Sequence, residues 1–193
     1  MEIFDEDIQL MLRFQNGEEH CFEKLVERHR DRVFNITYRY LGNYQEAEDT
    51  AQEIFIKIYN ARNTYKPEAK FTTWFYTICK NACLNKLRNK KPATVSIDST
   101  IELQENTVAS QIKDSQAQSP LDSMLNNEKS LIVKKAIDSL LPNQKMTVIL
   151  CRYDHLSYEE IAKVMGCSVK AVKSLLHRAM INLKENLADY FNK

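Results

Sequence analysis

The chain has 193 residues and a formal net charge of +1; 44% of the residues are hydrophobic and 27% are charged, which is normal for a soluble globular protein. Only 3 glycines and 4 prolines are present, few for a sheet protein with many turns, so we expect an all-α fold. No apolar run reaches the length of a membrane span, and the acidic N-terminus is unlike a signal peptide. Five irregularly spaced cysteines predict reduced thiols, and hence a cytoplasmic protein.

The charge is distributed unevenly along the chain. Residues 1–60 carry 13 acidic and 7 basic side chains, a net charge of −6, whereas residues 69–97 carry six basic side chains and no acidic one. Residues 168–184 carry four basic side chains and again no acidic one. Two separate basic segments in a nearly neutral chain predict two contacts with a polyanion.

The first three helices are expected over residues 6–41, as a pair ending at Gly17 and Gly42, and over 44–61. On the third helix one face is apolar and predicted to be buried. A second face is polar and acidic but includes an isoleucine; it consists of Asp49, Gln52, Glu53 and Ile56. This face is either a solvated acidic surface or a docking surface for a basic protein partner.

A polar loop, 62–70, precedes an amphipathic helix from Phe71 to Lys91. Aromatic residues alternate with basic and amide side chains across both segments, which suits stacking on unpaired bases and contact with a phosphate backbone. The alternative is that some of these aromatic rings are ordinary core. The candidate residues are Tyr65, Lys66, Phe71, Trp74, Lys80, Asn81, Asn85, Lys86 and Arg88.

Residues 92–127 are rich in Ser, Thr, Gln, Asn and Asp and carry five acidic side chains against one lysine. No helical periodicity persists there, so we predict a flexible acidic linker. Helical patterns resume at 128 and predict a C-terminal domain of about four helices.

The stretch from Ser157 to Arg178 is typical of a helix-turn-helix. Ser157 and Glu160 have the spacing of a capping box, Gly166 ends the first helix, and Ser168 caps the second. The second helix has a basic, hydrogen-bonding outer face that suits the major groove of duplex DNA, although an ordinary helical hairpin would share the pattern. The residues of this face are Ser168, Lys170, Ala171, Lys173, Ser174, His177 and Arg178.

No catalytic constellation is recognisable, so we predict that the chain is not an enzyme and has no cofactor. Cys79 with Cys83, and Cys151 with His155, are each four residues apart and could form half of a zinc site. Buried cysteine is more commonly a small core residue, so we predict no metal site.

Three stretches together resemble one family closely: YLGNYQEAEDTAQEIFIKIY (40–59), FTTWFYTICKNACLNKLRNKK (71–91) and LLPNQKMTVILCRYDHLSYEEIAKVMGCSVKAVKSLLHRA (140–179). The family is that of bacterial RNA polymerase sigma factors of the extracytoplasmic-function, or group 4, type. The resemblance covers residues 5–91 and 128–187. It implies a region 2 domain over 1–91, a linker over 92–127 and a region 4 domain over 128–193.

The resemblance also implies roles for the predicted surfaces. Asp49, Gln52, Glu53 and Ile56 match the segment that docks on the clamp helices of the largest polymerase subunit. Asn81 matches the position that captures a flipped base of the −10 element, and the basic helix around it matches the surface that melts and holds the non-template strand. The helix from Ser168 to Arg178 matches the reader of the −35 element in duplex DNA.

The implied partners are core RNA polymerase, including its second-largest subunit, promoter DNA and an anti-sigma factor, with no membrane insertion. The implied function is promoter-directed transcription initiation for a stress or envelope regulon. Two other classes stay open from the residues alone. One is a plain DNA regulator that binds an operator without polymerase, and the other is an interaction protein whose helix-turn-helix is only scaffold.

Overall fold

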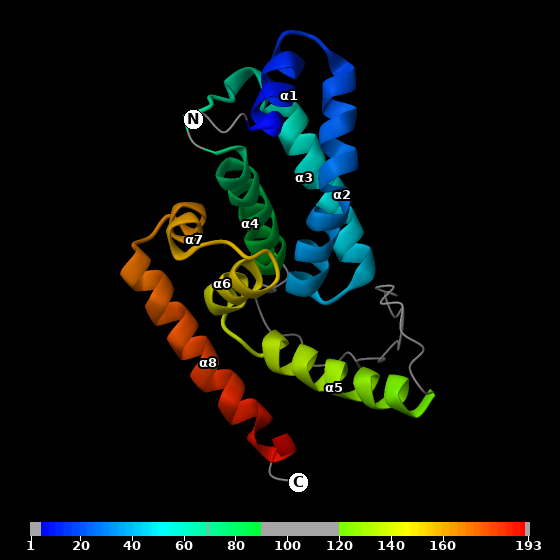
Figure 1. The fold of residues 1–193 in the computed structure, drawn as a ribbon, viewed down its shortest axis with the longest axis vertical. Helices are drawn as coiled ribbons and strands as arrows, with labels where there is room; N and C mark the ends of the chain where they lie inside the picture. Colours follow the sequence, from blue (N-terminus) through cyan, green and yellow to red (C-terminus); the bar gives the residue numbers. More distant parts are fainter. Residues whose placement is uncertain (1–4, 69, 90–119, 192–193) are drawn as a thin grey trace.

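The computed structural model describes residues 5–68, 70–89 and 120–191, which form eight α-helices and one short 3-10 helix (Figure 1). The all-α prediction is confirmed. The N-terminal unit consists of α1 (Glu6–Gln15), α2 (Glu19–Leu41), α3 (Tyr44–Asn60), the 3-10 helix η1 (Arg62–Thr64) and α4 (Phe71–Asn89). The C-terminal unit consists of α5 (Pro120–Asp138), α6 (Pro142–Arg152), α7 (Tyr158–Met165) and α8 (Val169–Phe191).

The helix ends follow the predicted signals. Gly42 and Gly166 adopt left-handed conformations, with φ of 77° and 68°, and end α2 and α7. Ser157 and Glu160 form both hydrogen bonds of the capping box at the start of α7. The Ser168 hydroxyl accepts from the Ala171 amide at 3.2 Å at the start of α8. The helix-turn-helix prediction is therefore confirmed in detail.

The N-terminal unit closes around aromatic and aliphatic side chains from all four of its α-helices. A buried polar contact fastens α1 to α2: His29 Nε2 lies 2.9 Å from Asp7 Oδ2, and Arg28 Nη1 lies 2.7 Å from Asp7 Oδ1. Burial alone would raise the pKa of Asp7, but the hydrogen bonds from His29 and Arg28 outweigh it, so the net pKa is lowered. The His29 ring lies against Phe75, with 4.7 Å between the ring centroids, which links this contact to α4.

The C-terminal unit contains the four helices expected, but its first helix begins earlier than predicted. Helix α5 starts at Pro120, so residues 120–127 are helical rather than part of the linker. Proline favours the first position of a helix because its missing N–H has no helical partner there. The remainder of the predicted linker, up to residue 119, lies outside the described residues.

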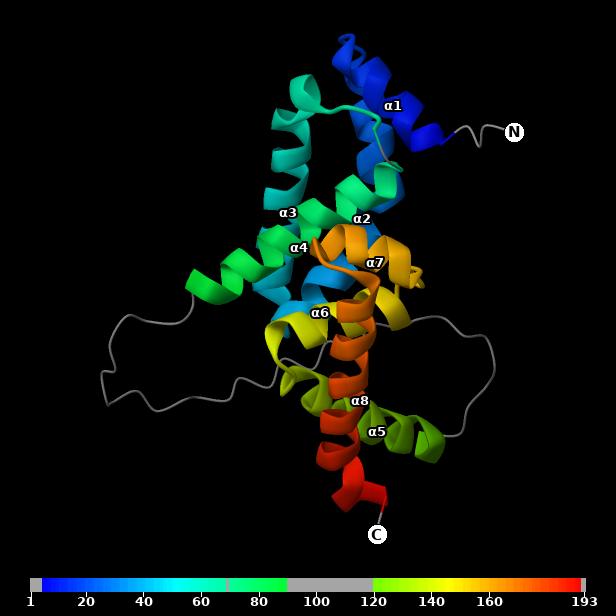
Figure 2. The ribbon, with the colours of Figure 1, turned by 90° about the vertical axis from the view of Figure 1, so that its left-hand side faces the viewer.

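The two units pack directly against each other. The sequence predicts two domains joined by a flexible linker, but it does not predict a contact between them. Both views show α7 beside α4 (Figures 1 and 2). The Tyr76 hydroxyl donates to Asp154 Oδ1 at 3.0 Å, and Lys80 Nζ donates to the Val164 carbonyl at 3.0 Å. At the edge of this contact Lys70 Nζ lies 2.9 Å from Glu160 Oε1. Helix α2 contacts the C-terminal unit as well, with the Arg39 guanidinium carbon 4.3 Å from the centroid of the Tyr153 ring. The arrangement is therefore closed through both α4 and α2.

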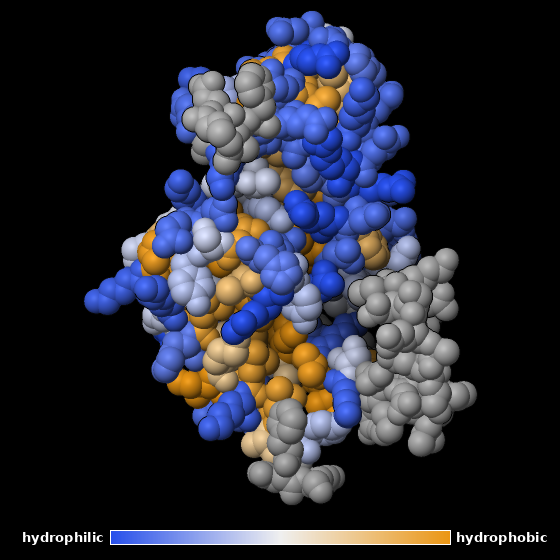
Figure 3. All heavy atoms as spheres, in the orientation of Figure 1, coloured by the Kyte–Doolittle hydropathy of each residue, from blue (hydrophilic) through white to orange (hydrophobic). Residues whose placement is uncertain are grey.

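Exposed hydrophobic side chains gather on the C-terminal unit in the face drawn in Figure 3, whereas the N-terminal unit is mostly hydrophilic there. The larger ones in α5 and α8 are Leu131, Val133, Met180 and Ile181. No helix in the described part of the chain combines the length and the apolar character needed to cross a bilayer.

The Asp7 contact generates a stability prediction. Replacing Asp7 with Asn removes the carboxylate that buried His29 contacts, while Arg28 keeps its pair with Glu6. We therefore expect the free energy of unfolding at pH 7 to fall by about 2–4 kcal/mol. Because the pKa of Asp7 is lowered in the fold, its stabilisation is complete above the usual aspartate pKa and is lost as the pH falls through the folded value. The difference between wild type and variant should therefore shrink below about pH 4.

Urea unfolding of both proteins across this pH range provides the measurement. Asp31→Asn is the matched control, because the Asp31 side chain is 88% exposed and forms only a surface pair with Arg30. A difference that stays constant down to pH 3 would contradict the assignment.

Candidate polymerase-docking and nucleic-acid surfaces

Helix α3 presents the predicted second face to solvent. Asp49, Gln52, Glu53 and Ile56 are all exposed, and the Ile56 residue is 60% exposed. The opposite face of α3 is buried through Ala47, Ala51, Ile54 and Ile58, which fixes the direction of the helix. An apolar side chain surrounded by acidic and amide groups on a rigid helix is suited to binding a protein with a basic rim.

The predicted aromatic residues before and within α4 divide into two groups. Trp74 is partly exposed, whereas Tyr65 and Phe71 are buried. The ring centroids of Tyr65 and Phe71 lie 4.8 Å and 5.6 Å from that of Trp74, so the three rings form one cluster. In this structure the buried Tyr65 and Phe71 rings pack beneath Trp74, and Trp74 is the ring of this cluster that reaches the protein surface.

The amide and basic residues of α4 share a solvent-facing strip. Asn81, Asn85 and Arg88 are exposed, and together they line a hollow between α4 and the start of α6. Lys86 is partly exposed, and Lys66 is exposed in the preceding loop. Lys80 is partly covered by its hydrogen bond to Val164, and this burial lowers its pKa. The strip can contact phosphates and base edges, but in this arrangement α7 borders it.

The first turns of α8 carry the second predicted surface. Ser168, Lys170, Lys173, Ser174, His177 and Arg178 are exposed, and Ala171 is partly exposed between them. Val172, Leu176 and Ala179 are buried on the opposite face. The Arg178 guanidinium folds back onto Ser174, with Nη2 3.1 Å from the hydroxyl oxygen. The first turn contains no acidic residue, so the face is positive and accessible.

The structure brings the α4 strip beside the helix-turn-helix, which the separate sequence patterns do not indicate. Three of the residues that hold this contact, Tyr76, Asp154 and Val164, belong to no motif that indicates it, and the capping box that includes Glu160 does not indicate its pairing with Lys70. Burial raises the pKa values of both Tyr76 and Asp154, and the Tyr76 hydroxyl is a hydrogen-bond donor to the Asp154 carboxyl. A polar pair between α4 and the α6–α7 turn therefore lies inside the closed arrangement.

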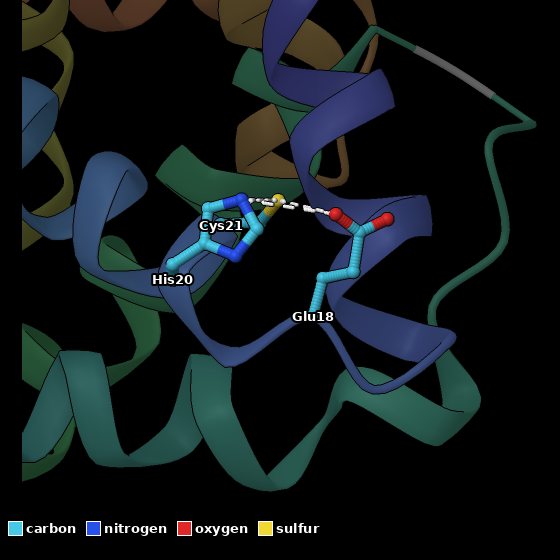
Figure 4. A group of neighbouring side chains, drawn as sticks. All are labelled: Glu18, His20 and Cys21. Atoms are coloured by element: carbon cyan, nitrogen blue, oxygen red, sulfur yellow. Dashed lines mark hydrogen bonds and ion pairs between the residues drawn. The ribbon is translucent and has the colours of Figure 1, made fainter.

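The cysteines of α4 are core residues in this structure. Cys79 and Cys83 are fully buried, and burial raises the pKa of both thiols, to about 12 for Cys83. A different group, Glu18, His20 and Cys21, places its ligand atoms within 4.8 Å of one another (Figure 4). Two nitrogens of the Arg13 guanidinium already bind the Glu18 carboxylate, and Cys21 is fully buried, so these contacts account for the group without an ion.

Two family models match the chain, one in each unit. The Sigma-70 region 2 model matches residues 25–92, and the Sigma-70, region 4 model matches residues 130–183. The ECF RNA polymerase sigma factor SigW of Bacillus subtilis is 34% identical over 176 residues, which is 91% of this chain and 93% of that protein. The ECF RNA polymerase sigma-E factor of Escherichia coli K12 is 34% identical over 175 residues, or 90% of both chains.

Solved structures show the same fold. CnrH, in complex with the cytosolic domain of CnrY, matches with a TM-score of 0.67 at 21% identity, covering 96% of this chain and 99% of that one. The sigma factor RpoE of Bartonella quintana, in complex with the anti-sigma factor NepR, matches with a TM-score of 0.62 at 22% identity, covering 86% and 96%. The sequence relatives and both family models agree, and the chain belongs to the extracytoplasmic-function group of RNA polymerase sigma factors.

Proposed function

We propose that this sigma factor directs initiation through surfaces on three helices. The exposed face of α3 binds core polymerase, the strip on α4 binds the −10 element as a single strand, and the start of α8 binds the −35 element as duplex. The observation that carries the proposal is that one chain presents a single-strand type of surface and a duplex type of surface on different helices. A regulator that binds only a duplex operator needs the duplex type of surface alone.

The α3 face is suited to the clamp helices of the largest polymerase subunit. Ile56 supplies an exposed apolar anchor, and Asp49 and Glu53 supply charges that steer a basic partner. Such an arrangement concentrates the binding energy in one central side chain and leaves the charged rim to set orientation. The second-largest subunit is a further partner in the assembled holoenzyme.

The α4 strip combines the groups that a melted −10 strand requires. The Asn81 amide can both donate and accept, so it can read the edge of an unpaired base, while Trp74 offers a partly exposed ring for stacking. Lys86 and Arg88 supply charge for the phosphates. Melting costs about 1.4 kcal/mol per stacked step, and capture of an unstacked base offsets part of that cost.

The first turns of α8 provide the duplex reader. An exposed N-terminal face with lysine, arginine, serine and histidine side chains is the part of a helix-turn-helix that enters the major groove. Lys170 and Lys173 are suited to the phosphates, and Ser174 and Arg178 are placed further along the same face, toward base edges.

Binding both promoter elements at once requires the units to separate. The element names place them about 25 base pairs apart, which is roughly 85 Å of B-form DNA at about 3.4 Å per base pair. In the closed arrangement α4 and α7 touch, with 3.0 Å between Lys80 Nζ and the Val164 oxygen. The chain between Asn89 and Pro120 can extend to roughly 100 Å at most, which is enough to allow the separation.

An anti-sigma factor can regulate this chain by holding the two units together. Both structural neighbours with high TM-scores were solved as complexes, RpoE with the anti-sigma factor NepR and CnrH with the cytosolic domain of CnrY. A partner that stabilises the closed arrangement would prevent simultaneous contact with both elements.

Because its proposed partners are core polymerase and promoter DNA, we propose that the protein works in the cytoplasm.

The primary test is run-off transcription with purified bacterial core polymerase over a pool of promoter fragments. We expect specific transcripts that depend on this protein, and their start sites will identify the two promoter elements. Duplex binding by the full chain without transcripts, and without co-elution with core polymerase, would instead support an ordinary regulator.

Asn81→Ala tests the −10 assignment. Loss of the amide should reduce open-complex formation about tenfold or more and relax preference at one base of the −10 element, because a specific base contact contributes about 1–3 kcal/mol. Permanganate footprinting of the melted strand measures both effects. Asn60→Ala, at the exposed end of α3, is the control, and unchanged −10 preference in Asn81→Ala would refute the role of this residue.

Ile56→Asp tests the polymerase-docking face. Replacing the exposed apolar anchor with a charge should weaken binding to core polymerase at least tenfold while leaving −35 duplex binding intact. Fluorescence anisotropy with labelled protein measures both affinities. Ile181→Asp is a matched control, because Ile181 is an exposed isoleucine on α8, outside the proposed −35 face. Equal losses in the two variants would argue against a specific role for α3.

The Lys70–Glu160 pair offers a test of separation. A zero-length carbodiimide reagent joins an amine to a neighbouring carboxylate, and these groups lie 2.9 Å apart across the two units. The cross-linked chain should lose the ability to form promoter complexes. Lys70→Arg keeps the ion pair but lacks the reactive amine, so the same treatment should spare it. If both treated proteins form promoter complexes equally well, separation of the units is not required.

A further inference from the structure

Helix α1 lies outside the matched region 2 model, which begins at residue 25, and carries none of the surfaces proposed above. It nevertheless contacts both ends of the loop between α3 and α4. This loop, residues 62–70, leads into the proposed −10 surface and adjoins Trp74. The contacts come from the two ends of α1, through Gln15 and Asp5.

Gln15 holds the start of the loop. Its side-chain nitrogen Nε2 donates to the Tyr65 carbonyl oxygen at 2.9 Å and also to the Arg62 carbonyl oxygen. One acceptor belongs to the first residue of η1 and the other to the residue that follows it, so one amide group fixes the turn of the backbone there. The Arg62 side chain adds a second contact to α1, with its guanidinium carbon 5.3 Å from the centroid of the Phe14 ring.

Asp5 holds the end of the loop. Its Oδ2 accepts from the Phe71 amide at 3.2 Å, at the first residue of α4, and its Oδ1 accepts from the Asp7 amide at 3.2 Å, near the start of α1. One carboxylate thus caps two helices, and its charge is favourable at both positive helix ends. This fixes where α4 begins relative to α1.

Tyr65 lies between these two attachment points. Its ring is buried against Trp74, and its hydroxyl is buried without a hydrogen-bond partner among the described residues. Burial raises the pKa of Tyr65 to about 12, with a further contribution from the negative charges of Asp5 and Asp7. The Tyr65 ring lies 6.2 Å from the Phe71 ring, at the residue whose amide Asp5 binds, while the Tyr65 backbone carbonyl is bound by Gln15.

We infer that Gln15 and Asp5 are positioning residues for −10 recognition, which hold loop 62–70 and the start of α4 in the conformation that receives the non-template strand. The inference rests on the proposed function of the α4 strip. Both residues act on backbone groups of the protein itself. Their effect is preorganisation: a loop already fixed in the free protein does not lose its conformational freedom when the strand binds.

Gln15→Glu is the sharpest variant, because it keeps the size of the side chain and replaces the donor with an acceptor that faces two carbonyl oxygens. Gln9→Glu is the matched control: the same substitution at an exposed position of the same helix. Both are studied as full-length chains in the holoenzyme. The probe is a fluorescent single-stranded oligonucleotide carrying the −10 element identified by run-off transcription.

We expect Gln15→Glu to bind this probe about five- to tenfold more weakly, with core-polymerase affinity and −35 duplex affinity within about twofold of wild type. In the free chain, hydrogen exchange should become faster at the amides of loop 62–70 and stay unchanged on α8. Gln9→Glu should match wild type in every measurement. Asp5→Ala should reproduce the loss, whereas Asp5→Asn, which retains a hydrogen-bond acceptor, should restore most of the binding.

The outcomes separate this inference from the function on which it rests. If wild-type holoenzyme does not bind the −10 strand, the proposed function of α4 fails. If wild type binds and Gln15→Glu and Asp5→Ala bind equally well, positioning by α1 is refuted whatever the exchange rates show. If both variants lose −35 duplex affinity to the same extent as strand affinity, the effect is general destabilisation and the inference is likewise refuted.

Discussion

Three faces of helix α4 meet three different environments: the N-terminal core, the C-terminal unit and solvent. The rest of the structure depends on how the residues of α4 are divided among these faces. One face, with Phe71, Phe75 and Cys79, is buried in the N-terminal core. A second reaches α7 and the α6–α7 turn through Lys80 and Tyr76. The third remains in solvent through Asn81 and its neighbours. A substitution on any of these faces therefore has a different type of consequence, for stability, for the closed arrangement or for strand binding.

Much of the fold could be predicted because its signals are local. The capping box at Ser157, the left-handed glycines and the helical periodicities act within a few residues, so they can be recognised without knowledge of the partner surfaces. The exposed faces of α3 and α8 were predictable for the same reason. Once the apolar positions fix which side of a helix is buried, the opposite side is determined.

What could not be predicted depends on contacts between distant parts of the chain. Tyr76 and Asp154 are far apart in sequence, and neither residue type identifies the other as its partner. The sequence predicted that the Tyr65 and Phe71 rings stack on unpaired bases. Tertiary packing instead buries both rings beneath Trp74. The start of α5 at Pro120 lies in a mainly polar segment, where Leu121, Met124 and Leu125 have helical spacing. Three apolar residues form too short a pattern to distinguish a helix from the polar linker that precedes it.

In the role that we infer for α1, a binding surface depends on residues with no motif. Asp5 and Gln15 act on backbone groups, an amide at Phe71 and carbonyls at Arg62 and Tyr65. Backbone groups are present at every position, so a sequence pattern does not reveal which ones are bound. A helix beyond the matched part of the family can in this way support the part that performs recognition.

Glu160 takes part in two contacts that respond differently when the units separate. It closes the capping box with Ser157 and also pairs with Lys70, and both contacts lower its pKa. In the separation that we propose, the cap persists while Lys70 loses its carboxylate partner and Lys80 loses its carbonyl partner. Under the proposed function, DNA then competes with the protein's own acceptors for these two ammonium groups. Added salt weakens the closed arrangement as well as the DNA complex. The salt dependence of promoter binding should therefore be shallower than the number of phosphate contacts alone implies.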